Sequence, residues 1–587
     1  MATEQHVQFA SGDCLLRGIL HTPDAECNRR AAFVFCPPFA EERKCAHRVL
    51  VRCARRFCDL GFSVLRFDLS GTGESEGAAA DAAPDRWRED VHAAIAFVRE
   101  AVGARHVGLL GLRLGASLSA QVAAERDDVQ WLVLWEPVVN GPRYLSLNLR
   151  RSLIKQMLTQ GKDFEATRSA AASEAGPRDT DFDGHRVSAA CQEQISQIDL
   201  TSLQRLTAPH VLLLHIGPRE VLSKECQAFL DHLRTLAVNV TAEAVREQPF
   251  WNLIGLVEGE AAVSGTVNWL NSSASDEGAD CARTPDAGRQ PAVRCVSRDA
   301  PMAPVTFTSR GSKLFGMLHR PDSVGPDAIG AILLHGWSGN RRGPHDMLVA
   351  AAAACCVRGM PALRFDFRGR GDSEGALFEA NLATMIEDTE CAARMIREMT
   401  GVKRLALIGI CSGCEVAIGA APLIPQVQAL ALWSAPMVAA SRAATRRRKQ
   451  LANLAEYGRK LFRAETWRKA FTGRLNVDLI KRAVTGKGGA GESPGEDGER
   501  AAPQPDIPWR ERFAACPRHV LFIYGGNDPV TPDAEAHYRR MSQRDGHDAR
   551  FHRVSGANHS FFSLDWKREV IEVTLDWLRE LQPTSSA

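Results

Sequence analysis

Three residues in the second half of the chain have the types and the order that nucleophilic catalysis needs. Cys411 is the central residue of GICSG at 409–413, which follows the apolar run LALIG and precedes a helix-like run. A strand, turn and helix in this order form a nucleophile elbow, which lifts the central side chain above a sheet. The start of the following helix carries partial positive charge, so it favours the thiolate form of the cysteine.

Two partners for this thiol follow in the chain. Asp528 lies in GGNDPVTP after the apolar run HVLFIY, and His559 lies in SGANHSFF before a C-terminal helix-like run. We expect His559 to accept the Cys411 proton, and Asp528 to fix the imidazole tautomer and stabilise the imidazolium. The order predicts a Cys–His–Asp triad that forms an acyl-enzyme from an ester, thioester or lactone.

The oxyanion site is predicted in HGWSG at 335–339, which follows the apolar run AILLH. A backbone N–H from this loop and the N–H of the residue after the nucleophile are the expected donors. We assign them to Trp337 and Ser412, with Ser338 as the alternative first donor. The turn FDFRGRGDSEG is predicted to be structural, and substrate contact by Arg368 or Arg370 is the alternative.

The chain carries one pattern twice. VQFASGDCLLRGILHTPD at 7–24 matches VTFTSRGSKLFGMLHRPD at 305–322, an offset of 298 residues, and RFDLSGTGESEG pairs with RFDFRGRGDSEG at the same offset. The offset later becomes 309, where HVLLLH pairs with HVLFIY. Near-continuous apolar runs separated by helix-length segments are typical of parallel sheets covered on both faces. We predict two tandem α/β domains with doubly wound, mostly parallel sheets, each with a helical cap insertion.

The predicted division of the chain is residues 1–271 for the first domain, 272–302 for a polar linker and 303–587 for the second domain. Caps are expected at about 138–206 and about 438–510. Within the second cap, residues 438–487 are strongly basic. This segment is interpreted as a solvated lid, and attraction of an anionic substrate or an anionic membrane surface is the alternative.

The first copy lacks all three predicted catalytic residues. By the two offsets, Arg113 takes the nucleophile position, Arg219 the acid position and Phe250 the histidine position. Pro38 lies in the oxyanion loop and has no N–H to donate. We predict a pseudo-hydrolase that supports its neighbour. Arg113 either recognises an anionic ligand or forms an ion pair with a nearby acid, Glu41 or Glu42.

Taken together, HGWSG, FDFRGRGDSEG, G-x-C-x-G, GGNDP and ANHSF resemble the α/β-hydrolase superfamily over nearly all of both copies. The second copy is similar to the type-one hydrolase associated with the exosortase A system of bacterial exopolysaccharide loci. The first copy, with CPPFAEER, GLRLGA, LWEPVVNG and EQPFW, resembles the type-two partner. The resemblance implies a fused pair linked to exopolysaccharide biosynthesis or export, without naming a substrate.

Composition is that of an ordinary soluble globular protein, with 45% hydrophobic and 24% charged residues. A net charge of +2 disfavours a nucleic-acid binder. No secretory signal and no run long enough to span a bilayer is visible, so the expected location is the cytoplasm, with the 16 cysteines mostly reduced. We expect the two domains to contact each other. Peripheral contact with a membrane through the basic cap is left as an alternative. No cofactor and no metal are expected.

Three other functions remain open at this point. The first is an acyltransferase, in which an acceptor alcohol takes the place of water and the substrate is a polysaccharide or lipid precursor. The predicted hydrolase would instead act on a small-molecule acyl substrate or on one linked to a lipid or polysaccharide. A redox pair of Cys411 and Cys414 is the second alternative. A non-enzymatic assembly protein is the third.

Overall fold

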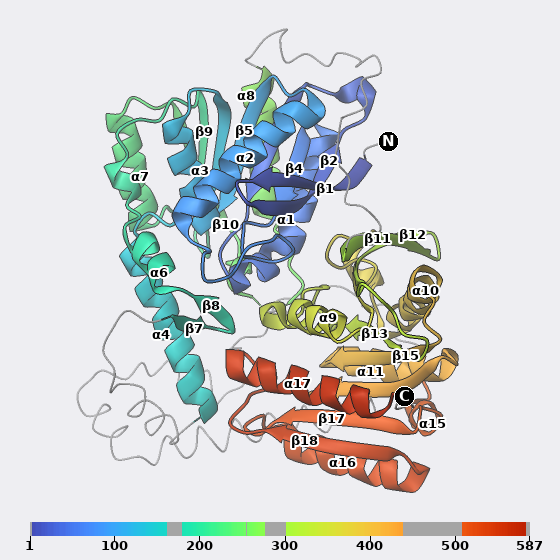
Figure 1. Ribbon diagram of the computed structural model, residues 1–587. Coiled ribbons are helices and arrows are strands. Elements are labelled where there is room, and N and C mark those ends of the chain that lie inside the picture. Colours follow the sequence, from blue (N-terminus) through green and yellow to red (C-terminus); the bar gives the residue numbers. More distant parts are fainter. Residues whose placement is uncertain (1–2, 161–178, 254, 276–300, 438–506, 583–587) are drawn as a thin grey trace, which may run out of the picture.

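The computed structural model describes residues 3–160, 179–253, 255–275, 301–437 and 507–582 (Figure 1). Each half of the sequence forms an eight-stranded sheet, with the order β1-β2-β4-β3-β5-β6-β9-β10 in the first and β11-β12-β14-β13-β15-β16-β17-β18 in the second. In each sheet the first two strands of this order run antiparallel to their neighbours, and the remaining strands are parallel. The prediction of two doubly wound, mostly parallel α/β domains is confirmed.

The N-terminal sheet consists of β1 (Thr3–Ser11), β2 (Cys14–Thr22), β3 (Ala31–Cys36), β4 (Ser63–Phe67), β5 (His106–Leu112), β6 (Val129–Trp135), β9 (His210–Gly217) and β10 (Val240–Arg246). The helices of this half are α1 (Glu41–Asp59), α2 (Pro84–Val102), α3 (Leu114–Glu125), α4 (Gly141–Gln160), α6 (Ala189–Ser196), α7 (Lys224–Thr235) and α8 (Glu260–Ser275).

The C-terminal sheet consists of β11 (Met302–Ser309), β12 (Ser312–His319), β13 (Ile329–Leu334), β14 (Ala362–Asp366), β15 (Arg404–Ile410), β16 (Val427–Trp433), β17 (His519–Gly525) and β18 (Asp548–Val554). The helices of this half are α9 (Met347–Val357), α10 (Leu382–Thr400), α11 (Ser412–Ala420), α15 (Trp509–Ala514), α16 (Thr531–Asp545) and α17 (Leu564–Glu580).

Each sheet buries an apolar core on both of its faces. Successive side chains of a strand point to opposite faces, so Val34 of β3 joins the core that α2, α3 and α7 cover, and Phe33 joins the core that α1 and α8 cover. The C-terminal half repeats this arrangement, with α10, α11 and α16 on one face and α9 and α17 on the other. Burial on both faces explains why the strands read as continuous apolar runs.

Between β6 and β9, the N-terminal half carries α4, a hairpin of β7 (Thr180–Phe182) and β8 (His185–Val187), and α6. The cap predicted at about 438–510 lies outside the described residues up to position 506, as does its basic segment. Most of the predicted linker, residues 276–300, also lies outside them. Within the described ranges, no helix has the length and apolar character needed to cross a membrane.

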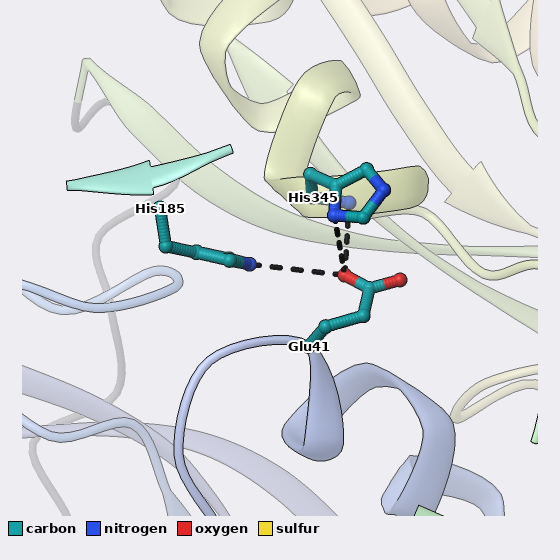
Figure 2. Close-up of side chains that lie close together, drawn as sticks. All are labelled: Glu41, His185 and His345. Carbon is teal, nitrogen blue, oxygen red and sulfur yellow. Dashed lines mark hydrogen bonds and ion pairs between the residues drawn. The ribbon is translucent and has the colours of Figure 1, made fainter. Parts of the chain in front are cut away.

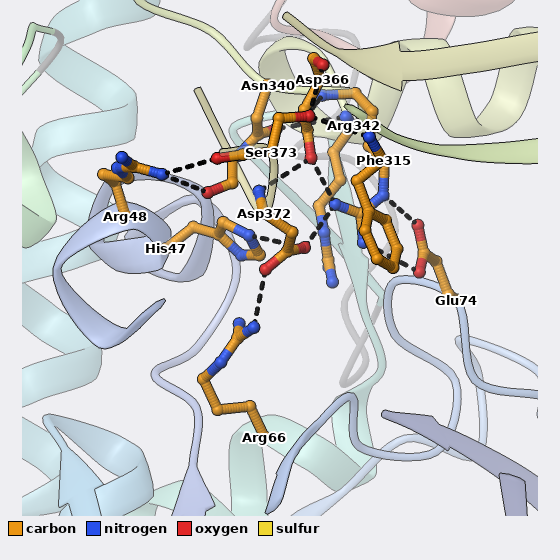
Figure 3. Close-up of polar contacts among 12 residues, drawn as sticks. His47, Arg48, Arg66, Glu74, Phe315, Asn340, Arg342, Asp366, Asp372 and Ser373 are labelled. Carbon is orange, nitrogen blue, oxygen red and sulfur yellow. Dashed lines mark hydrogen bonds and ion pairs between the residues drawn. The ribbon is translucent and has the colours of Figure 1, made fainter. Parts of the chain in front are cut away.

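Ion pairs between the two halves repeat at the offset of 298 residues. Figure 3 shows the surroundings of Asp372, with Arg66 and His47 beside it. Arg66 of the N-terminal half lies 2.6 Å from Asp372 of the C-terminal half. In return, Arg364 of the C-terminal half lies 2.9 Å from Glu74 of the N-terminal half. Arg364 is the equivalent of Arg66 at the offset of 298 residues, and Glu74 is the equivalent of Asp372. The two halves therefore exchange equivalent contacts across a pseudo-twofold axis.

Arg341 lies between the two exchanged pairs. Its guanidinium lies 3.0 Å from Glu74, 2.6 Å from Asp366 and 2.5 Å from Asp372. Burial alone would raise the pKa values of Glu74 and Asp372, but the surrounding arginines, together with His47 beside Asp372, hold both well below their ordinary values. The network is buried and rich in cations, so both carboxylates stay charged.

Candidate active site

The nucleophile elbow forms between β15 and α11. Cys411 has φ 55° and ψ −127°, a backbone conformation that is strained for a residue with a side chain. The flanking glycines are required by close packing: a Cβ on Gly409 would lie 2.5 Å from the Gly413 carbonyl oxygen, and one on Gly413 would lie 2.3 Å from that of Leu334. The turn therefore raises the Cys411 side chain at the first turn of α11.

Asp528 and His559 meet at the carboxyl end of the sheet. His559 Nδ1 lies 2.7 Å from Asp528 Oδ2, and Asp528 Oδ1 accepts the N–H of Val530 at 3.1 Å. Because both oxygens have a partner, the buried carboxylate is oriented toward the imidazole. The tautomer with hydrogen on Nδ1 leaves Nε2 as the base.

The loops that carry these two residues are joined through the backbone. The Asn527 N–H donates to the Ala557 carbonyl at 2.9 Å, and the Gly526 N–H donates to the Val554 carbonyl at 2.8 Å. A Cβ on Gly525 would lie 2.4 Å from the Asn558 carbonyl oxygen, so this glycine permits the close approach. The sequence run GGNDP is thus explained by the packing of its turn against the histidine loop.

Cys411 and His559 are coupled electrostatically. Burial alone would raise the pKa of the Cys411 thiol, but its hydrogen bond with His559, the charge of that imidazolium and the Ser412 N–H hold the pKa below its ordinary value. Burial alone would lower the pKa of His559, but Asp528 and the Cys411 thiolate raise it to about 10. The three predicted triad residues lie together, and their charges favour the thiolate form of Cys411 and the protonated form of His559.

The loop predicted to supply the first oxyanion donor lies beside the elbow. The Trp337 N–H donates to Ser412 Oγ at 2.7 Å, which directs this amide toward the nucleophile turn. Arg370 donates from Nε to the Trp337 carbonyl at 2.6 Å, and its guanidinium lies 5.6 Å from the centre of the Trp337 ring. Arg370 therefore holds the Trp337 loop, a structural contact whose partner the turn motif did not indicate.

Two other residues considered from the sequence have packing roles. Arg368 forms a buried ion pair with Asp388 at 2.6 Å and donates to Ser309 Oγ at 2.9 Å. Cys414 is buried, and its thiol donates to the carbonyls of Gly409 and Trp433 at 3.2 and 3.3 Å. Burial raises the pKa of Cys414 well above its ordinary value, which disfavours a redox partnership with Cys411.

The N-terminal half has the same elbow turn, with an arginine at the position of Cys411. Arg113 has φ 56° and ψ −122°, close to the values at Cys411. Its guanidinium lies 3.4 Å from Glu42 and 5.4 Å from the ring centres of Tyr144 and Trp251. Tyr144 donates to the other oxygen of Glu42 at 3.0 Å. Of the two acids considered for Arg113, Glu42 is the one it pairs with.

The other two positions of the degenerate site hold no replacement for the acid and the histidine. Arg219 is exposed, and Phe250 is buried against Trp135 and Trp251. In the same half, His215 Nδ1 lies 2.7 Å from Glu136 Oε2. Aromatic packing has taken the place of the histidine loop.

One set of residues near the site was not found from the sequence. Asn527, next to Asp528, donates from Nδ2 to the carbonyl of Thr159 in α4 at 2.7 Å. Lys155 of the same helix lies 4.5 Å from the ring centre of Phe562, in the segment after His559. Figure 1 shows α4 extending from the N-terminal half toward β17 and β18. The N-terminal half thus contacts both loops that carry the acid and the histidine.

Family models match both halves of the chain. Residues 331–573 match the model described as alpha/beta hydrolase family, and residues 28–181 match the one described as serine aminopeptidase, S33. The chain contains two domains of the alpha/beta hydrolase superfamily. The C-terminal hydrolase domain carries Cys411 at its elbow, and the N-terminal hydrolase domain carries Arg113.

Three solved structures of hydrolases are similar to part of the chain. A proline iminopeptidase from Mycobacterium smegmatis is 18% identical, with 47% of this chain and 98% of that chain covered and a TM-score of 0.34. A dienelactone hydrolase from Anabaena variabilis is 16% identical over 48% and 98%, with a TM-score of 0.31. An a/b serine hydrolase without lid from Xanthomonas campestris is 16% identical over 49% and 97%, also at 0.31. No curated protein matches the chain.

Proposed function

We propose that the C-terminal hydrolase domain is a cysteine-dependent acyl hydrolase that cleaves ester or thioester bonds. The observation that carries the proposal is the coupling of Cys411, His559 and Asp528: the pKa of the thiol is lowered and that of the imidazole is raised to about 10. A buried cysteine without such a partner has a raised pKa, as Cys414 does. The lowered value supports a nucleophile at Cys411 rather than a packing residue.

In the proposed reaction the Cys411 thiolate attacks the carbonyl carbon, and the carbonyl oxygen becomes an oxyanion. The N–H groups of Trp337 and Ser412 are assigned to this oxyanion, which replaces Ser412 Oγ as the partner of the Trp337 amide. The oxyanion then collapses, the bond between the carbonyl carbon and the leaving group breaks, and the His559 imidazolium protonates that group. The acyl group stays bonded to Cys411 Sγ. In the second step His559 takes a proton from water, the hydroxyl attacks the acyl-enzyme, and Cys411 leaves as the thiolate.

We propose a non-catalytic role for the N-terminal hydrolase domain. Arg113 cannot act as a nucleophile, and its guanidinium lies against Glu42, Tyr144 and Trp251. The contact of Thr159 with Asn527 supports a role in positioning the acid and histidine loops of the neighbouring domain. The resemblance of the two halves to an exosortase-associated pair supports a link to exopolysaccharide biosynthesis or export and names no substrate.

The proposal is tested with the purified full chain and a panel of p-nitrophenyl esters and acyl thioesters. Cys411→Ala is expected to abolish turnover, and Cys411→Ser to leave a trace. Cys356→Ser, which changes a half-buried thiol on α9 away from the elbow, serves as the control and should keep full activity. Mass spectrometry of the quenched reaction should place the acyl group on the peptide that contains Cys411. A fully active Cys411→Ala enzyme, or an acyl group on a different residue, would reject the proposal.

A further inference from the structure

Glu41, His185 and His345 come together at the contact between the two halves (Figure 2). Glu41 is the first residue of α1, and His185 is the first residue of β8 in the insertion of the N-terminal half. His345 belongs to the C-terminal half, in the short helix before α9. Figure 2 shows the two imidazoles pointing at one oxygen of the glutamate from different sides.

The separations between these atoms fit a metal centre better than hydrogen bonds. His345 Nδ1 lies 3.4 Å from Glu41 Oε2, and His185 Nε2 lies 3.7 Å from the same oxygen. Hydrogen bonds to oxygen are usually about 2.7–3.2 Å long. Two ligands of a tetrahedral zinc ion, each bound at about 2.0–2.1 Å, lie roughly 3.3–3.5 Å apart. All three donor atoms lie within 4.8 Å of one another, so one ion can reach them with small adjustments.

Both imidazole nitrogens that face Glu41 are buried without a hydrogen-bond partner among the described residues. Buried polar atoms in folded proteins nearly always have a partner, so two such nitrogens directed at the same carboxylate require an explanation. A bound cation would satisfy both at once. This observation is independent of the spacing of the three residues.

The surroundings leave Glu41 Oε2 available and orient the imidazoles. Lys44 binds the other oxygen, Oε1, at 2.7 Å, and the backbone N–H of His345 donates to Oε2 at 2.9 Å. A carboxylate oxygen accepts two bonds, so Oε2 keeps one position for a metal. On the far side of His185, Nδ1 lies 4.0 Å from Asp346 Oδ2, beyond hydrogen-bond distance.

A second cluster offers a comparison. Glu136, His215 and Cys226 also bring three ligand types together in the N-terminal half. There the imidazole is already hydrogen-bonded to the carboxylate at 2.7 Å, and burial raises the pKa of the Cys226 thiol to about 12. Since a thiol must lose its proton to bind zinc, this cluster is a poor site. It supplies a matched control.

We propose that Glu41, His185 and His345 bind one divalent transition-metal ion, with zinc as the best match, and that this ion joins the two halves of the chain. Two ligands come from the N-terminal half and one from the C-terminal half, so the site is complete only when the halves are in contact. His185 and Asp346 also line a cavity of about 400 Å³ beside Pro38, Lys567 and α9. The fourth coordination position is assigned to a water or an anionic group from this cavity.

The test uses the full chain, stripped with a chelator and titrated with Zn²⁺ or Co²⁺ alone. One ion per chain is expected. The Co²⁺ absorption spectrum should show nitrogen and oxygen ligands and lack a thiolate-to-metal charge-transfer band, which separates this site from the 16 cysteines. His345→Ala and His185→Ala should each weaken binding by about 100-fold or more, since even outer-shell changes cost about 10–100-fold. His215→Ala in the comparison cluster should leave the affinity unchanged.

X-ray absorption of the zinc-loaded wild-type chain gives a second readout that needs no variant. Two imidazoles and no sulfur are expected around the ion. Sulfur ligands, the absence of stoichiometric binding, or undiminished affinity in a folded His345→Ala variant would each overturn the site. Because these readouts measure metal binding rather than turnover, they are independent of the proposed acyl hydrolysis.

Discussion

Arg66 and Asp372, which belong to different halves of the chain, form an ion pair at 2.6 Å whose carboxylate has no exposed surface. Arg341 and His47 also contact Asp372, at 2.5 and 3.1 Å. Removing the negative charge leaves the buried Arg66 guanidinium without this carboxylate, whereas Arg341 keeps Glu74 and Asp366. Asp372→Asn is therefore expected to lower the free energy of unfolding by about 3–5 kcal/mol, measured by urea denaturation.

An exposed ion pair is the control for this variant. Arg550 and Glu580 lie 2.6 Å apart, with side chains that are 49% and 56% exposed. Glu580→Gln should change the free energy of unfolding by less than about 1 kcal/mol. Equal effects of Asp372→Asn and Glu580→Gln would show that the buried network does not stabilise the contact between the halves.

The pH dependence of turnover follows from the coupling of Cys411 with His559. The active form needs the thiolate and the imidazolium, so activity is lost when the thiolate takes up a proton in acid and when His559 loses its proton in base. The pKa of Cys411 lies below its ordinary value and that of His559 at about 10, so kcat/KM should have a broad plateau that falls near pH 10.

Asp528→Asn should change this profile as well as the rate. The carboxylate raises the pKa of His559, so its loss should move the basic limb to lower pH. It should also lower kcat by about 10²- to 10⁴-fold, the usual contribution of acid–base catalysis. Steady-state kinetics from pH 5 to pH 11, a range chosen to span both limbs, would measure both effects. A basic limb that stays in place would contradict the proposed role of Asp528.

The Trp337 backbone amide is tested with a pair of variants at one position. Trp337→Pro removes the N–H that lies 2.7 Å from Ser412 Oγ, whereas Trp337→Ala keeps it and removes only the ring. The proline variant should lose about 10²- to 10³-fold in kcat, as expected for one oxyanion donor. The alanine variant should retain most of kcat. Circular dichroism checks that both are folded, and equal losses in the two would refute the assignment.

Arg113→Met tests the N-terminal hydrolase domain. Turnover should stay within about twofold of wild type, because Arg113 takes no part in the proposed chemistry. The free energy of unfolding should fall by up to about 3–5 kcal/mol, because Glu42 then loses its cationic partner in a buried position. A large loss of turnover without a loss of stability would assign the degenerate site an active function.

The two sheets and the order of the predicted triad can be predicted from the sequence alone, because short sequence patterns indicate both. Apolar runs, the glycines around Cys411 and the GGNDP turn each act over a few residues. The contact of Asn527 with Thr159 joins residues 368 positions apart, and no local pattern reports it. Arg370 shows the same limit: its turn motif indicates a structural residue, but only the fold places its guanidinium against Trp337. The cluster of Glu41, His185 and His345 is formed by three separate segments, so no local sequence pattern predicts it either.

The exchange of Arg66 with Asp372 and of Arg364 with Glu74 has a consequence for how the two halves diverged. Equivalent contacts made in both directions are the pattern of a symmetric dimer of one subunit. In such a dimer every substitution appears in both subunits at once, so an arginine at the elbow would remove both nucleophiles. Once both copies lie in one chain, each position changes alone. His47 still faces Asp372, while its counterpart His345 has turned to Glu41. Two copies in one chain can therefore carry different residues at their elbows, Arg113 and Cys411, and stay at a fixed ratio of one to one.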